Sequence, residues 1–437
     1  MTRLSWTAVC LFAVWVSAVS AQNKSTAQKS NPKVAGAKSG GPAAKKPEAA
    51  KKPEAAKSEK PADKASPEAA KSDDSAVAEF ETIFADWKEL LSKMEDLRNE
   101  YVATPRGPQR EPLKKKYADL VAEGEKMEPK VVKAAEAAFA AAGNQESEAA
   151  KFLAAMLKYE VEHDNYEPAV PIARTLIDNN YDNPRVYNYG GMAAFFTNDY
   201  ADAEKWLKEG DKHSVLEVDA KQYLSHIGQY EELWDTEQKL REAEAEADDL
   251  PRVLLKTSQG DIVVELFENE APNTVANFIH LVEEGFYNGL KFHRVLEHFM
   301  AQGGDPNGDG TGGPGYTIPD EIDRSDYRNH FRGGLSMAKT EAPNSGGSQF
   351  FLMFRPSGPG AGYNLNGKHT VFGRAIEGMD VLSRIQRIDP EKAQPGQKPD
   401  KIIEAKVLRK RKHDYVPKKV GDEPEEKPDE TSGAKKK

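Results

Sequence analysis

The chain of 437 residues is long enough for two or three domains, and it combines 38% hydrophobic with 30% charged and only 8% aromatic residues. Its mean hydropathy of −0.71 is low for a uniformly folded chain, so we expect part of it to stay unfolded. The single cysteine, Cys10, excludes a disulfide framework, a thiolate zinc site and an iron–sulfur cluster. A formal net charge of −10 argues against a nucleic-acid partner.

Residues 1–21 have the pattern of a secretory signal peptide. Arg3 precedes an apolar stretch, Leu4 to Val19, and Val19-Ser20-Ala21 supplies the small residues of a cleavage site. The alternative is an uncleaved membrane anchor, but this run of about 16 residues is shorter than the roughly 20 that a spanning helix needs. We therefore expect cleavage, no stable membrane insertion, and export to the periplasm, with secretion or a secretory-pathway lumen as alternatives. Loss of Cys10 with the signal suits an oxidising compartment.

Charged segments flank the central part of the chain. Residues 22–75 hold 12 lysines against 7 acidic residues, lack aromatic residues and repeat the run Lys-Lys-Pro-Glu-Ala-Ala-Lys. Such a composition buries too little apolar surface to offset chain entropy, which predicts a disordered linker. Residues 409–437 are predicted to be a disordered charged tail for the same reason. The acidic excess lies between these two segments, where it would repel polyanions.

Residues 76–249 are predicted to form a helical domain. Apolar residues recur there at steps of three and four, which indicates one buried stripe: Phe80, Phe84, Trp87, Leu90, Leu91, Met94 and Leu97. The run Pro105-Arg106-Gly107-Pro108 should end this helix, and an alanine-rich helix should follow through residues 131–142.

An internal repeat follows within this domain. Asn165-Tyr166-x-x-Ala169 is matched 34 positions later by Asp199-Tyr200-x-x-Ala203, with the small pair Gly190-Gly191 between them. The pattern resembles tetratricopeptide repeats, with a degenerate third unit around Gly228-Gln229-Tyr230. This resemblance implies helical hairpins that could hold a protein partner. An irregular helical domain without a ligand groove remains the alternative, because a self-sufficient stack needs about three repeats.

Residues 251–408 show a β-rich pattern. Runs at 253–257 and 261–266 flank a hairpin signal at Ser258-Gln259-Gly260, and short helices are predicted at 274–284 and 379–385. These signals predict a closed antiparallel barrel. Asp305-x-Asn307-x-Asp309-Gly310 imitates part of a calcium loop, but Tyr316 stands where the bidentate glutamate is needed.

Seven motifs then appear in order between residues 292 and 373, within this stretch of about 160 residues. They are Phe292-His293-Arg294, Phe299-Met300-Ala301-Gln302-Gly303-Gly304-Asp305, Gly310-Thr311-Gly312-Gly313, Leu335-Ser336-Met337-Ala338, Asn344-Ser345-Gly346-Gly347, Ser348-Gln349-Phe350-Phe351 and Leu365-Asn366-Gly367-Lys368-His369-Thr370-Val371-Phe372-Gly373. In this order they resemble the cyclophilin family of peptidyl-prolyl isomerases. The resemblance implies a multidomain chain in which repeat-like helical hairpins precede a mainly-β closed barrel of eight antiparallel strands with two helices.

The resemblance also implies the active groove and its chemistry. Arg294, Gln302 and Phe299 would be the catalytic set, with Arg294 donating to the prolyl nitrogen of the twisted amide and Gln302 helping to fix that arginine. Substrate-binding residues would be Met300, Gly310, Ala338, Lys339, Thr340, Gln349, Phe351, Asn364, Leu365 and His369. No metal and no cofactor are needed, because the reaction only rotates an amide bond.

The function that follows is isomerisation of X–Pro bonds in unfolded or partly folded exported proteins, as assistance to their folding. A barrel that binds proline segments without turnover, or a scaffold dominated by the repeat domain, are the alternatives. Asn364 occupies a position where the family often has tryptophan, which puts strong binding of the inhibitor cyclosporin in doubt.

Overall fold

The computed structural model describes residues 67–143, 145–392 and 397–422, so the expected signal peptide and most of the expected linker lie outside the described residues. The chain divides into two compact units, one ending at Asn144 and the other beginning at Gln145. None of the described helices is long and apolar enough to cross a membrane.

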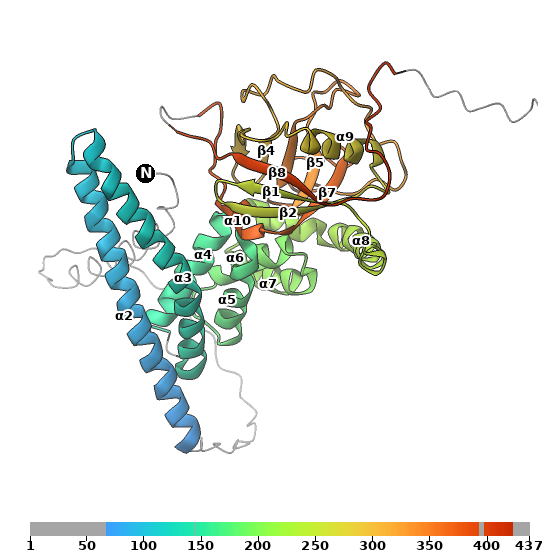
Figure 1. Cartoon of the computed structure of the whole chain (residues 1–437). Helices are drawn as coiled ribbons and strands as arrows, with labels where there is room; N and C mark the ends of the chain where they lie inside the picture. Colours follow the sequence, from blue (N-terminus) through green and yellow to red (C-terminus); the bar gives the residue numbers. More distant parts are fainter. Residues whose placement is uncertain (1–66, 144, 393–396, 423–437) are drawn as a thin grey trace, which may run out of the picture. The chain divides into compact units, whose positions relative to one another are not determined.

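The first unit is a helical hairpin. Helix α2 (Pro67–Ala103) and helix α3 (Glu111–Ala142) run side by side, joined by a short 3-10 turn at Pro108–Arg110 (Figure 1). Every member of the stripe predicted between Phe80 and Leu97 is buried, which confirms the helical periodicity. Helix α2 begins at Pro67, inside the segment that was expected to be linker.

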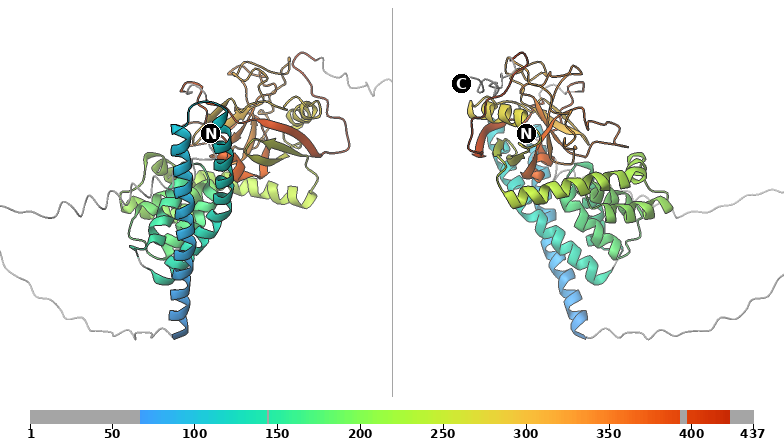
Figure 2. Two further views of the ribbon diagram at one scale, coloured as in Figure 1. Left: turned by 60° about the vertical axis from the view of Figure 1, so that its left-hand side comes forward. Right: turned by 90° about the vertical axis from the view of Figure 1, so that its right-hand side faces the viewer.

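The second unit opens with five helices. They are α4 (Glu148–Glu162), α5 (Tyr166–Asp178), α6 (Arg185–Phe196), α7 (Tyr200–Lys212) and α8 (Val218–Ala247). The glycine pair lets adjacent helices approach closely: a Cβ at Gly190 would lie 2.8 Å from that of Ala173, and one at Gly191 would lie 2.6 Å from Leu207 Cγ. Helix α8 is one continuous rod (Figure 2) where a degenerate third hairpin was expected. Membership of the tetratricopeptide-repeat family stays a prediction.

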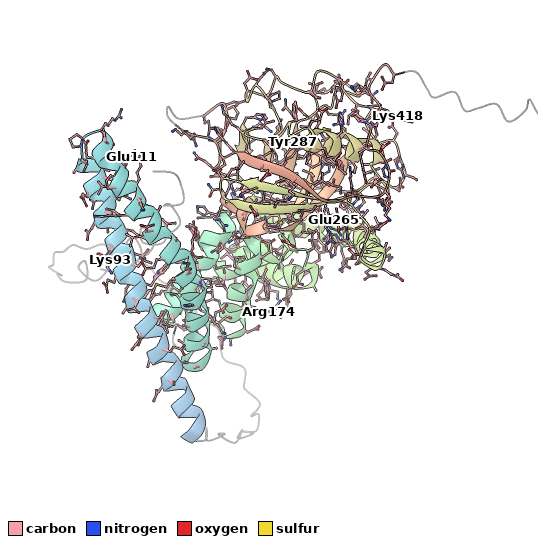
Figure 3. All side chains as sticks on the ribbon, viewed as in Figure 1. Lys93, Glu111, Arg174, Glu265, Tyr287 and Lys418 are labelled. Carbon is pink, nitrogen blue, oxygen red and sulfur yellow. The ribbon has the colours of Figure 1, made fainter. Side chains whose placement is uncertain are left out.

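An eight-stranded antiparallel sheet completes this unit. Its strands are β1 (Arg252–Thr257), β2 (Gly260–Leu266), β3 (Arg294–Leu296), β4 (Met300–Gly303), β5 (Gly334–Met337), β6 (Phe350–Met353), β7 (Val371–Glu377) and β8 (Ile402–Arg409). The order across the sheet is β3-β4-β6-β5-β7-β2-β1-β8. Helices α9 (Pro272–Glu283) and α10 (Met379–Arg384) lie close to their predicted positions. Side chains of the curled sheet and α9 fill one core, which contains the fully buried Tyr287 (Figure 3).

The prediction of a closed barrel is wrong, because the sheet is an open half-barrel. No ladder joins β3 to β8 among the described strands. Isolated hydrogen bonds link the two edges instead, such as Phe292 N to Asp400 O at 2.9 Å and Gly289 N to Ile402 O at 2.7 Å. Turns at Gly285 and Gly289, both with positive φ, keep the segment before β3 from extending into a strand long enough to close the seam.

The prediction of disorder from Arg409 onward is also wrong for its first residues. Strand β8 runs through Arg409, and Tyr415 is buried in the sheet core. The Tyr415 hydroxyl donates to Glu268 Oε2 at 2.8 Å and accepts from the Arg411 backbone N–H at 3.0 Å. Tyr415 therefore anchors this part of the tail together with polar contacts such as that of Arg411 with Asp249, while residues 423–437 lie outside the described residues.

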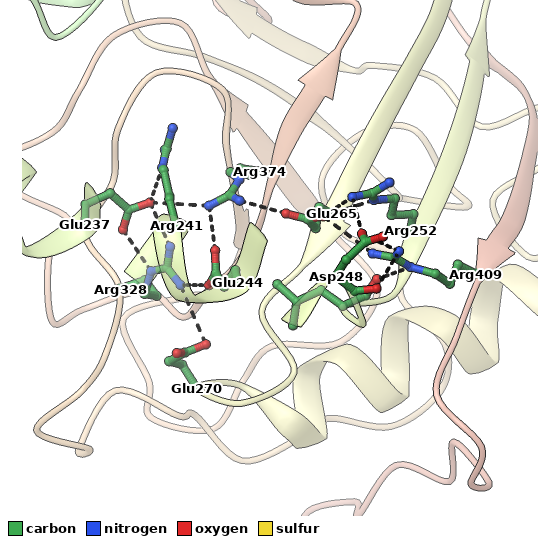
Figure 4. A network of polar contacts seen from close by, with 11 residues as sticks. Glu237, Arg241, Glu244, Asp248, Arg252, Glu265, Glu270, Arg328, Arg374 and Arg409 are labelled. Atoms are coloured by element: carbon green, nitrogen blue, oxygen red, sulfur yellow. Dashed lines mark hydrogen bonds and ion pairs between the residues drawn. The ribbon is translucent and has the colours of Figure 1, made fainter. Parts of the chain in front are cut away.

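Alternating charges join α8 to the sheet (Figure 4). Arg328 contacts Glu237 and Glu244 of α8, and Arg374 of β7 continues the series with Glu244 at 2.8 Å and Glu265 at 2.7 Å. These carboxylates and Arg328 are buried, so each charge depends on its neighbours for stabilisation. The network fixes α8 to the sheet and its loops, which carry the residues of the predicted active groove.

Candidate active site

The hairpin of β3 and β4 positions Arg294. Arg294 and Gln302 are partners in the antiparallel register, so their side chains lie on the same face of the sheet. The next residue on β3, Val295, points to the opposite face and packs in the core. The Arg294 guanidinium lies beside the predicted apolar wall: Nη1 is 3.9 Å from Met300 Sδ, and the guanidinium carbon is 5.8 Å from the Phe299 ring centroid.

Arg294 is half-buried and keeps its charge available. Burial lowers the pKa of Arg294, and the nearby charges of Asp389 and Glu391 oppose that shift. Within the described residues, no carboxylate forms an ion pair with this guanidinium, and Asp389 and Glu391 act on it only through their charge. A guanidinium stays protonated at neutral pH, so its N–H groups can be given to a ligand.

The predicted apolar residues meet in one cluster. Met300 and Phe351 are buried together with Met353, and partly buried side chains pack against them: Leu296, Phe299, Ala338, Tyr363 and Leu365. Phe299 of the predicted catalytic set and three predicted substrate-binding residues, Met300, Phe351 and Leu365, are therefore brought together beside Arg294. Partly buried apolar side chains over a buried floor suit the binding of an apolar ring.

Gln302 and Gln349 form the polar edge of this cluster. Gln302 Nε2 donates to Gln349 Oε1 at 2.9 Å, and Gln349 Nε2 donates to the carbonyls of Gly310 and Gly312, each at 2.9 Å. The expected fixing of Arg294 by Gln302 has no hydrogen bond behind it among the described contacts. Gln302 instead holds the side chain of Gln349, and Gln349 ties the loop that carries Gly310 to the edge of the site.

The segment from Ala338 to Thr340 is less available than expected. The Ala338 N–H donates to Gln349 O at 2.9 Å, and the Thr340 N–H donates to Ser345 Oγ at 3.1 Å. Lys339 Nζ pairs with Asp320 at 2.9 Å, and its side chain is largely buried. The N–H groups of Ala338 and Thr340 are therefore already used inside the protein. A bound peptide would have fewer backbone donors to pair with in this segment.

The other side of the site is built by Tyr363 and His369. The Tyr363 ring packs on Phe299 with centroids 4.1 Å apart, whereas Asn364 is exposed and accepts from the Asn366 N–H at 3.1 Å. The aromatic wall therefore comes from the residue before Asn364. His369 places its ring edge against Phe351 and its Nδ1 3.0 Å from Met337 O, and burial lowers the pKa of its imidazole.

Known proteins with the same pattern are numerous. The family model described as cyclophilin type peptidyl-prolyl cis-trans isomerase/CLD matches residues 252–407. A peptidyl-prolyl cis-trans isomerase of Synechococcus elongatus is 50% identical over 142 residues, which covers 32% of this chain and 92% of that protein. One from Helicobacter pylori is 48% identical over 137 residues, covering 31% of this chain and 80% of its own length. The chain belongs to the cyclophilin-type peptidyl-prolyl cis-trans isomerase family.

The resemblance drawn from the motifs is thereby confirmed, and residues 252–407 form the cyclophilin domain. A crystal structure of a cyclophilin-type isomerase from Cryptosporidium parvum, obtained in the presence of the dipeptide Ala-Pro, is 33% identical to this chain. It covers 36% of this chain and 98% of its own, with a TM-score of 0.31.

One residue behind the cyclophilin site escaped the sequence analysis. His330 is fully enclosed, and its ring lies parallel to Phe351 with centroids 6.0 Å apart. Its Nδ1 is 2.9 Å from Asn366 Oδ1, and its Nε2 is 2.9 Å from Ser336 Oγ. Burial lowers the pKa of His330 to about 4, so a neutral imidazole supports the pocket floor. A lone histidine in a loop carries no local signal of this role.

The loop that imitates a calcium site is organised differently. The Asp305 carboxylate accepts backbone N–H groups from Asn307 at 2.8 Å, Asp309 at 3.0 Å and Gly312 at 3.0 Å, and also from Gly310. Its oxygens are therefore engaged by the loop's own backbone. Among the described residues, no group of three or more histidines, cysteines or carboxylates could hold a metal ion.

Proposed function

We propose that this cyclophilin isomerises X–Pro bonds in exported polypeptides and so assists their folding, with Arg294 as the catalytic hydrogen-bond donor. The observation that supports the mechanism is the half-buried guanidinium of Arg294, which has no ion-pair partner in the described part of the chain and lies beside the cluster of Phe299, Met300 and Phe351. The guanidinium lies 3.9 Å from Met300 Sδ and 5.8 Å from the centre of the Phe299 ring. A proline ring bound against these side chains could therefore turn its nitrogen toward Arg294.

The reaction explains why these groups suffice. Rotation about an X–Pro bond breaks amide resonance, with a barrier of about 18–20 kcal/mol. As the amide twists, its nitrogen becomes pyramidal and basic, and an N–H of Arg294 can then donate to it. This hydrogen bond is absent in the planar ground state, so it lowers the barrier selectively.

The size of the effect is within reach of such a site. Uncatalysed exchange takes tens of seconds, so turnover in milliseconds requires about four decades, or roughly 5.5 kcal/mol. One charged hydrogen bond aimed at the developing lone pair, combined with fixation of the ring by the apolar cluster, is of that order.

Exchange spectroscopy on a short proline peptide tests this assignment. Wild type should interconvert the cis and trans signals rapidly, whereas Arg294→Ala should bind the peptide and interconvert it slowly. Binding without turnover by the wild type would favour the non-catalytic alternative. Equal turnover by both proteins would remove Arg294 from the mechanism.

Export is supported by the pattern of residues 1–21 and by the absence of cysteine from the remainder of the sequence. Sequencing the amino terminus of the protein purified from cells tests it. Cleavage after Ala21 should give a mature chain beginning at Gln22 in the periplasmic fraction. Recovery of an intact Met1 from the cytoplasm would contradict export.

A further inference from the structure

Two helix–helix turns of the repeat region, 34 residues apart, share one design. Asp164 precedes the start of α5 with φ of 60°, and Asn198 precedes α7 with φ of 64°. In each turn the tyrosine two residues later donates to this side chain: Tyr166 to Asp164 Oδ1 at 2.6 Å, and Tyr200 to Asn198 Oδ1 at 3.1 Å. Asparagine and aspartate both tolerate this left-handed conformation, so a neutral amide satisfies the turn.

The turn itself therefore does not need the negative charge of Asp164. The carboxylate instead contacts residues of the cyclophilin domain. The carboxylate is fully buried. Its Oδ2 accepts from the His298 backbone N–H at 3.1 Å and from Arg387 Nη2 at 2.7 Å. Its Oδ1 lies 2.8 Å from His298 Nδ1, and Arg355 Nε is 3.6 Å away. A carboxylate is the side chain that can accept from this many donors at once.

His298 links this carboxylate to the active site. It forms the turn between β3 and β4 in a left-handed conformation, with φ of 61°, and directly precedes Phe299. Its carbonyl accepts from the Tyr363 hydroxyl at 2.9 Å, and the ring of Tyr363 packs on Phe299. Asp164 and Tyr363 thus hold the N–H and the carbonyl of one residue, His298, whose backbone leads directly into Phe299 and sets the direction of its ring.

We propose that Asp164 is a positioning residue of the isomerase site, through which the helical repeats hold the His298 turn and fix Phe299 against the proline pocket. This inference rests on the proposed function of the pocket. If Asp164 has this role, the helical region contributes to the geometry of the active site and does not only precede the cyclophilin domain in the chain.

The expected effect separates positioning from stability. Phe299 contacts the proline ring in the ground state and in the transition state alike, so a loosened Phe299 should raise KM more than it lowers kcat. A variant that is merely less stable contains less folded enzyme, which lowers the apparent kcat and leaves KM unchanged. The two explanations therefore move different parameters.

The test uses Asp164→Asn in the full-length protein, since asparagine already serves the equivalent turn at Asn198. We expect KM for a proline peptide to rise about five- to ten-fold, because small misplacements in a site can cost up to two decades. The matched control is Glu237→Gln, which neutralises another buried helical carboxylate, one that pairs with Arg328 of the cyclophilin domain and not with the His298 turn. It should leave KM within two-fold of wild type.

A second pair of variants covers the case in which Asp164→Asn does not fold. His298→Ala removes the imidazole and should raise KM, whereas His298→Asn retains a donor near the Nδ1 position and tolerates the left-handed backbone, so it should restore KM. An unchanged KM in Asp164→Asn, or in His298→Ala if Asp164→Asn is unfolded, overturns the inference. Arg294→Ala assayed in parallel separates this failure from a failure of the proposed function, since only the latter predicts that Arg294→Ala turns over normally.

Discussion

Arg328 of the cyclophilin domain and Glu237 of α8 form a bidentate ion pair inside the second unit. Nε and Nη2 of the arginine lie 2.8 Å from the two carboxylate oxygens, and the side chains are 1% and 5% exposed. Burial alone would raise the pKa of Glu237, but the hydrogen bonds and charges of Arg328 and Arg241 hold it below its usual value. Helix α8 and the cyclophilin domain therefore share buried charges that neither could leave unpaired at low cost.

Replacing Glu237 tests that coupling. Glu237→Ala leaves Arg328 buried with one carboxylate fewer, and we expect the free energy of unfolding to fall by about 3–5 kcal/mol. Urea titration followed by circular dichroism measures it. The matched control is Glu204→Ala, which removes an exposed ion pair with Lys208 on α7 and should cost less than about 1 kcal/mol. Equal losses in the two variants would contradict a stabilising role for the buried pair.

The cyclophilin domain should also depend on helices α4–α8 as a whole. Arg328, Arg332, Arg355 and Arg374 all pair with carboxylates of the helices, through Glu237, Glu167, Asp219 and Glu244. Residues 251–422 alone would lose these partners, so we expect a melting temperature about 10 °C or more below that of residues 145–422. Calorimetry of the two fragments measures the difference, and identical melting temperatures would show that the contacts contribute nothing.

His330 should make stability fall in mild acid. Its pKa is about 4 in the folded protein and near 6.5 when unfolded, so its contribution is complete above pH 6.5 and is lost as pH falls toward 4. Between pH 7 and pH 4.5 this loss is about 2–3 kcal/mol. Comparing wild type with His330→Gln at both pH values isolates the effect. The variant should show a smaller fall with pH, and parallel curves would remove His330 from the explanation.

Asn364 should limit the affinity for cyclosporin. It is exposed at the rim, and the aromatic wall is supplied by Tyr363 instead. We expect Asn364→Trp to gain about five- to thirty-fold in inhibition, because a buried aromatic contact is worth roughly 1–2 kcal/mol. Inhibition of peptide isomerisation measures it, with Lys368→Trp as the control at another exposed rim residue. A gain in the control alone would place the inhibitor elsewhere.

Much of the site could be predicted because its chemistry is carried by contiguous motifs. The segment from Phe299 to Asp305, and that from Leu365 to Gly373, each place several site residues on one strand or turn, so their order along the chain already indicated their neighbours in space. The helical stripe of α2 was visible for the same reason, since periodicity is a local property.

What the sequence concealed depends on contacts between distant residues. Asp164 and His298 are 134 positions apart, and nothing near either one distinguishes this pair from two ordinary turn residues. The burial of Tyr415 in a strongly charged tail, and the open seam of the sheet, likewise depend on packing and on single turns. Composition averages over such positions, which is why the tail was expected to be disordered from its first residue.

The most direct measurement compares kcat/KM of wild type and Arg294→Ala on one proline peptide, at equal folded fraction. Loss of a donor aimed at the transition state should lower kcat/KM by about two to three decades, while Arg384→Ala, an exposed arginine of α10, should remain at the wild-type value. An Arg294→Ala enzyme within two-fold of wild type would contradict the account, because the prolyl nitrogen would then be served by some other group.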